Sequence, residues 1–104
     1  MRATKENILQ YLEEIKKEFA NEGITTFALF GSYAKNTQTV YSDIDIAIAK
    51  DKSFLVQNSS YAYFDIVAKL KEKIGKNFHK NIDIFDLDCV SPLKKSIQSE
   101  LIYV

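Results

Sequence analysis

Apolar residues recur every three or four positions near the start of this chain, and this pattern predicts an amphipathic helix from Thr4 to about Asn21. Thr4 is a candidate N-cap, and Gly23 is a candidate stop, because glycine readily adopts the left-handed conformation that ends many helices. We expect the apolar stripe of this helix to pack on a sheet; it consists of Ile8, Leu12, Ile15 and Phe19.

A second helix is predicted from Ser59 or Ser60 to about Ile74, with Gly75 as its stop. A last, shorter helix is expected to begin at Ser91 and Pro92, because proline suits the first helical position after a serine cap. The apolar stripe of the second helix consists of Tyr63, Val67, Leu70 and Ile74.

Strand-like patterns lie between these helices. Thr26 to Phe30 is a short apolar run, whereas Asp43–Ala49 and Asn81–Leu87 alternate apolar and polar residues. The hydrophobic tail from Leu101 to Val104 is expected either to add an edge strand or to meet a partner. Strands and helices mixed along 104 residues predict one α/β (α+β) domain, residues 1–104, in which helices flank a mixed β-sheet.

Two acids separated by one residue, Asp43 and Asp45, begin the middle strand. Because side chains alternate across a strand, both acids face one side and the isoleucines beside them face the other. Neighbouring carboxylates repel each other, and a divalent cation such as Mg²⁺, which prefers hard oxygen ligands, removes that repulsion. The small side chains of Ala47 and Ala49 on the acid side are expected to leave space for a nucleotide.

Gly31 and Ser32 follow the first strand and open a short predicted helix, Ser32–Asn36. Glycine lets the backbone approach a phosphate, a helix N-terminus offers free N–H groups, and the serine hydroxyl adds a donor. A Gly-Ser pair alone usually marks a turn. The acid pair alone also fits a charged strand edge, a structural cation site, or the acids of sugar transferases and haloacid-dehalogenase-like phosphatases. Together, the two motifs favour nucleotidyl transfer.

Nucleotidyl transfer needs a third carboxylate if a side chain is to take the proton of the acceptor hydroxyl, since Asp43 and Asp45 are engaged as metal ligands. Asp83 is the candidate, because it alternates with apolar neighbours on the following strand. Asp86 and Asp88 are competitors from the same stretch. Asp86 and Asp88 would fall on the same face of that strand as its apolar residues, and this favours Asp83.

Composition narrows the classes of partner. Fourteen basic and fourteen acidic residues give a formal net charge of zero, so the positive charge that favours direct nucleic-acid binding is missing. The one cysteine, Cys89, excludes an internal disulfide and is expected to be a buried, inert thiol. No secretory or membrane-spanning stretch stands out, so we expect a cytoplasmic protein that does not associate with membranes.

The combined pattern resembles the nucleotidyltransferase superfamily that has the palm of polymerase beta as its catalytic core, and specifically the minimal nucleotidyltransferases (MntA-like antitoxins). Their pattern is Gly-Ser, a short helix ending in Ala-Arg-Gly, a variable loop, and Ser-Asp-hydrophobic-Asp-hydrophobic. Lys35 stands in place of the arginine and keeps its charge without its forked geometry. Asn36 stands in place of the glycine and can still adopt a left-handed conformation. The matching residues are Gly31-Ser32-Tyr33-Ala34-Lys35-Asn36 and Ser42-Asp43-Ile44-Asp45-Ile46.

The resemblance implies roles for these residues in a Mg²⁺-dependent transfer from ATP. Asp43, Asp45 and Asp83 would bind metal, and Asp83 would also activate the acceptor hydroxyl. The phosphates would be positioned by Gly31 and Ser32, with help from Lys35, and Ser42 would orient the acid pair. Tyr33, beside the phosphate turn, is a candidate to stack near a base.

The resemblance also implies a partner. Minimal nucleotidyltransferases pair with a HEPN-domain ribonuclease toxin, and the implied reaction transfers AMP from ATP to a tyrosine of that toxin. One alternative is an antitoxin that neutralises its toxin by binding alone. Another is a small-molecule nucleotidyltransferase similar to the aminoglycoside-modifying kind.

Overall fold

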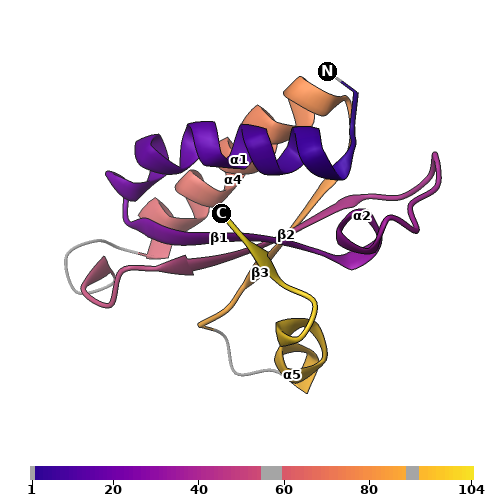
Figure 1. Ribbon diagram of the computed structural model, residues 1–104. Helices are drawn as coiled ribbons and strands as arrows, with labels where there is room; N and C mark the ends of the chain where they lie inside the picture. Colours follow the sequence, from indigo (N-terminus) through magenta and orange to yellow (C-terminus); the bar gives the residue numbers. More distant parts are fainter. Residues whose placement is uncertain (1, 55–59, 89–91) are drawn as a thin grey trace.

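The computed structural model describes residues 2–54, 60–88 and 92–104, and within them a four-stranded sheet carries helices on both sides (Figure 1). The expectations for Ser59, Cys89 and Ser91 lie outside the described residues. Along the chain the elements are α1 (Lys5–Ala20), β1 (Ile24–Phe30), α2 (Gly31–Lys35), β2 (Ile44–Lys50), α4 (Ser60–Phe78), β3 (Ile82–Asp86), α5 (Pro92–Gln98) and β4 (Ile102–Tyr103).

The strands lie in the order β3-β2-β1-β4. β1 pairs antiparallel with both β2 and β4, whereas β2 pairs parallel with β3. The predicted mixed sheet with flanking helices is therefore confirmed. Of the two outcomes expected for the hydrophobic tail, the structure shows the edge strand, because β4 pairs with β1.

Helices α1 and α4 cover one face of the sheet, and α5 lies on the other side (Figure 1). The predicted stripe of α1 is buried, and the Thr4 hydroxyl caps the helix by accepting a hydrogen bond from the Asn7 N–H at 3.1 Å. Beneath these helices the three isoleucines of β2 are fully buried. The central strand is therefore fixed by its apolar face, which leaves the opposite face free for polar residues. None of the described helices is long and apolar enough to cross a membrane.

The second helix is longer than predicted, because Gly75 does not end it. Gly75 stays helical and α4 continues to Phe78, which is 4% exposed and packs edge to face on Tyr11 with ring centroids 5.6 Å apart. Burial of this extra aromatic residue outweighs the modest helix penalty of one glycine. The helix ends instead at His79, whose φ of 55° is left-handed.

Candidate active site

Gly31 brings the backbone unusually close to one of the acids. The residue before it, Phe30, pairs with Asp45 across β1 and β2. Gly31 has a φ of +74°, and a Cβ atom placed on it would overlap Oδ2 of Asp45. Glycine is therefore required here for two reasons: the backbone conformation is one that other residues rarely adopt, and the Asp45 carboxylate occupies the space of a side chain.

Asp45 and Asp83 lie side by side. They are paired in the parallel register of β2 and β3, and the side chain of Asp83 hydrogen-bonds to that of Asp45. Asp43 immediately precedes β2 and is close enough for its charge to act on Asp45. Burial first, and then the charges of Asp83 and Asp43 together with the hydrogen bond that protonated Asp45 donates to Asp83, raise the pKa of Asp45 to about 6.

This cluster suits a hard cation that keeps other ligands. Asp43 and Asp83 are exposed and Asp45 is half-buried, so all three offer carboxylate oxygens to an ion approaching from solvent. Within the described residues, no three His, Cys, Asp or Glu side chains stand close enough to form a metal shell by themselves. Mg²⁺ usually takes one or two carboxylates and completes its octahedron with water and substrate phosphates, so the donor set fits that ion.

The competitor Asp86 lies on the opposite face of the sheet from this cluster. It pairs with Ile48 in the register of β2 and β3, beneath α4. Its Oδ2 accepts hydrogen bonds from Lys50 Nζ at 2.7 Å and from the Tyr63 hydroxyl at 2.6 Å. These donors hold the pKa of Asp86 below its usual value despite partial burial. The contacts of Asp86 are those of a carboxylate that stabilises the fold.

Asp88, the other competitor, also joins this structural cluster. Its Oδ2 accepts hydrogen bonds from the backbone N–H of Lys50 at 3.0 Å and from Lys50 Nζ at 3.4 Å. The sequence predicted from strand alternation that Asp83 and Asp86 face opposite sides of the sheet, and the structure places them so.

The remaining motif residues have specific partners. Lys35 forms an ion pair with Glu100, which lies between α5 and β4, rather than pointing freely into the site. Asn36 adopts the left-handed conformation expected of it, with φ 59° and ψ 34°. The Ser42 hydroxyl accepts a hydrogen bond from the Thr39 N–H at 2.9 Å, so it shapes the loop before the acids.

Two expectations about space near the site are wrong. Ala47 is fully buried, and the half-buried rings of Phe30 and Phe85 come from the strands on either side of it and meet edge to face at 6.4 Å. No open floor for a nucleotide therefore lies above Ala47. Tyr33 is 2% exposed and belongs to the hydrophobic core, so it cannot stack on a base in this conformation.

Sequence reasoning missed Lys80. Its Nζ donates a hydrogen bond to the Val40 carbonyl oxygen at 2.7 Å and so reaches the loop that carries Asp43. Lys80, Asp43 and Tyr41 together line a shallow hollow of about 440 Å³ between this loop and the end of α4. No sequence motif could reveal the contact, because the acceptor is a backbone carbonyl forty residues away.

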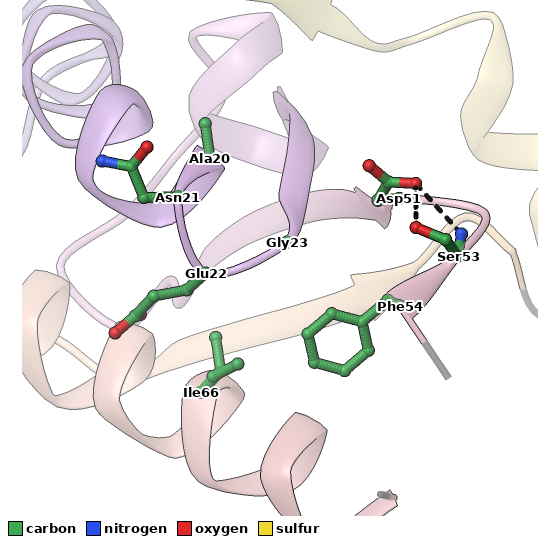
Figure 2. A pocket seen from close by; sticks show the side chains of 8 residues that line it. All are labelled: Ala20, Asn21, Glu22, Gly23, Asp51, Ser53, Phe54 and Ile66. Carbon is green, nitrogen blue, oxygen red and sulfur yellow. Dashed lines mark hydrogen bonds between the residues drawn. The ribbon is translucent and has the colours of Figure 1, made fainter. Parts of the chain in front are cut away.

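A separate hollow of about 350 Å³ lies at the other end of the strands. Figure 2 shows the side chains that line it. Phe54 packs against Gly23 there, and Asp51 accepts hydrogen bonds from the N–H and hydroxyl of Ser53, both at 3.0 Å. Gly23 precedes β1 and Gly31 follows it, so about 20 Å of strand separates this hollow from the acids. We assign the candidate site to the acid cluster, because its carboxylates are the candidate metal ligands.

Comparison with solved structures gives the fold. A structure described as a "putative minimal nucleotidyltransferase" superposes with a TM-score of 0.71 at 21% identity, covering 96% of this chain and 95% of that one. A structure described as a toxin-antitoxin with AMP-PNP superposes with a TM-score of 0.53 at 24% identity, covering 88% of this chain and 63% of that one. Both structures share the fold of this chain.

Sequence comparison then gives the family. The model of the family "Polymerase beta, Nucleotidyltransferase" matches residues 13–104, and the chain belongs to this family. A Methanocaldococcus jannaschii protein named "putative protein adenylyltransferase" is 36% identical over 83 residues, which cover 78% of this chain and 77% of that protein. The predicted superfamily is confirmed, and the chain is an enzyme of the nucleotidyltransferase class.

Proposed function

We propose that this chain transfers AMP from ATP to a tyrosine of a HEPN-domain toxin, with Mg²⁺ as the metal. Membership of the nucleotidyltransferase family supports the reaction type, and the relative named as a protein adenylyltransferase supports a protein as acceptor. The toxin-antitoxin neighbour with AMP-PNP supports a toxin as partner and ATP as donor.

The observation that carries the proposal is the pairing of Asp45 with Asp83 beside Gly31, with the charge of Asp43 close enough to act on Asp45. Asp43, Asp45 and Asp83 would hold Mg²⁺, which supplies positive charge against the triphosphate and the developing negative charge of the reaction. Gly31 and Ser32 would position the outer phosphates through the backbone N–H groups where α2 begins and through the Ser32 hydroxyl.

The residues around the metal have further roles in the proposal. Lys35 would add positive charge beside the phosphates once it leaves Glu100. Ser42 would keep the shape of the loop that delivers Asp43.

The proposed step is an in-line displacement at the α-phosphorus. The acceptor oxygen forms a bond to the α-phosphorus while the bond to the bridging oxygen of the β-phosphate breaks, and pyrophosphate leaves. The proton of the acceptor hydroxyl passes to Asp83, whose exposed carboxylate can be reached by a side chain from another protein. The half-buried Asp45 would stay behind it as a metal ligand.

The test is to mix the purified chain with ATP, Mg²⁺ and a HEPN-domain protein encoded beside it, and then to weigh both proteins by mass spectrometry. We expect the partner to gain one AMP on a tyrosine, and Asp43→Asn to abolish the gain. A toxin that is inhibited without a gain in mass would instead support neutralisation by binding alone. Nucleotide transfer to an aminoglycoside without any protein partner would support the small-molecule enzyme.

A further inference from the structure

We infer that Lys80 is a positioning residue for Asp43: its ammonium group holds residues 37–43, here termed the acid loop, so that Asp43 stands beside Asp45 and Asp83. The inference rests on the proposed function, in which these acids bind Mg²⁺. It adds a residue from outside the motif to the machinery of the metal site.

Hydrophobic burial does not fix the acid loop in place. Its two large apolar residues, Val40 and Tyr41, are 79% and 91% exposed. Hydrogen bonds within the loop join the Thr39 N–H to the Ser42 hydroxyl at 2.9 Å and the Tyr41 N–H to the Thr39 hydroxyl at 3.2 Å. These bonds set the internal shape of the loop, but they do not set its position relative to the sheet.

Two consecutive residues, Lys80 and Asn81, form hydrogen bonds to the chain on either side of Asp43. Lys80 Nζ donates to the Val40 carbonyl oxygen at 2.7 Å, and the Ile44 N–H donates to the Asn81 carbonyl oxygen at 3.0 Å. Asp83 follows two residues later. One short segment at the start of β3 therefore determines where Asp43 lies and also supplies Asp83.

The backbone of Lys80 is held in place by the turn that ends α4. The left-handed conformation at His79 turns the chain, and the Lys80 N–H donates to the Gly75 carbonyl oxygen at 3.3 Å. A hydrogen bond from a charged donor is stronger than a neutral one. The Thr37 N–H, which donates to the Ser32 carbonyl oxygen at 2.9 Å, ties the start of the acid loop to α2. Without the bond from Lys80 to Val40, the middle of the loop would have to be ordered when the metal binds, and the lost conformational freedom would weaken binding.

The experiment measures Mn²⁺ binding to the purified chain by calorimetry, with no nucleotide or partner present. Lys80→Met keeps most of the aliphatic stem and removes the ammonium group, so we expect about tenfold weaker binding, as for other residues that orient metal ligands. Lys80→Arg restores a cationic donor and should recover part of the loss. Lys76→Met is the matched control, because Lys76 pairs with Glu72 on the exposed side of α4, which ends shortly before Lys80.

A second measurement separates positioning from a loss of stability. In metal-free buffer, hydrogen exchange should become faster in residues 38–43 of Lys80→Met, while exchange in the core of α1 and β2 stays unchanged. Equal Mn²⁺ affinity for wild type and Lys80→Met would overturn the role of Lys80 and leave the proposed function standing. Failure of the wild type to bind Mn²⁺ even with a non-hydrolysable ATP analogue present would overturn both.

Discussion

Asp83 lies directly opposite Asp45 in the parallel pairing of β2 with β3, and its carboxylate accepts a hydrogen bond from the protonated Asp45 carboxyl group. Two carboxyl groups this close cannot both ionise without cost, and partial burial of Asp45 adds to that cost. The metal-free protein therefore holds a proton on Asp45 up to a pH of about 6. In the proposed mechanism, a cation would replace this proton.

Asp45 should destabilise the metal-free fold at neutral pH. Its pKa is raised from 3.8 to about 6, so the unfavourable contribution is absent below pH 3.8 and complete above pH 6. Asp45→Asn should therefore raise the free energy of unfolding at pH 7.5 by on the order of 1–2 kcal/mol, allowing for partial exposure.

Urea denaturation in EDTA at pH 7.5 and pH 4 measures this effect, and the gain should nearly vanish at pH 4. Added Mg²⁺ should then stabilise the wild type more than the variant. An Asp45→Asn variant that is less stable than wild type at pH 7.5 in EDTA would contradict the electrostatic account.

Gly31→Ala should damage both stability and activity. Alanine at φ +74° is strained, and its Cβ would displace the Asp45 carboxylate. We expect a loss of about 1–3 kcal/mol in the free energy of unfolding and about a hundredfold loss of transfer rate. Gly23→Ala is the matched control, because Gly23 has a φ of +103° and a Cβ there would overlap Phe54, far from the acids. This variant should lose stability but keep its transfer rate under conditions where it is folded.

The acids Asp83 and Asp86 should separate activity from stability. Asp83→Asn should lower the transfer rate by about 10²–10⁴-fold with the fold intact, because the proton acceptor is lost. Asp86→Asn should keep the rate and lose about 1–3 kcal/mol of stability, because Lys50 and Tyr63 would lose a charged acceptor. Rates from mass spectrometry and unfolding curves from circular dichroism measure the two effects. The opposite pattern would make Asp86 the third acid.

The ion pair of Lys35 with Glu100 should affect ATP more than stability. Both side chains are partly exposed, and such surface pairs contribute about 0–1 kcal/mol. Glu100→Gln should free Lys35 for the triphosphate and lower the KM for ATP, whereas Lys35→Met should raise it several-fold. Steady-state kinetics at saturating Mg²⁺ provide the measurement. If neither variant changes the KM, Lys35 has no role in binding phosphate.

The sequence predicted features that depend on local patterns. The stripe of α1 follows from helical spacing, and the strand predicted from Asp43 is found to begin one residue later, since β2 begins at Ile44. The parity of β3 also predicted which of its acids faces the site. In each case the residues that carry the pattern lie close together in the sequence.

Features that depend on distant contacts were not predictable. Gly75 resembles a helix stop until Tyr11 provides a partner for Phe78 one turn later. The space expected above Ala47 disappears because Phe30 and Phe85 reach it from neighbouring strands. The bond from Lys80 to the Val40 carbonyl depends on backbone geometry, which leaves no trace in residue identity.

The placement of Asp83 and Asp86 on opposite faces of β3 has a consequence for how the protein folds. A shift of β3 by one residue against β2 would turn every side chain of the strand over. Asp83 would then point beneath α4, Ile82 and Ile84 would face the reacting side, and the bond from the Tyr63 hydroxyl to Asp86 would be lost. A molecule with β3 in the wrong register would therefore lose this stabilising bond and the position of Asp83 in the candidate site at the same time.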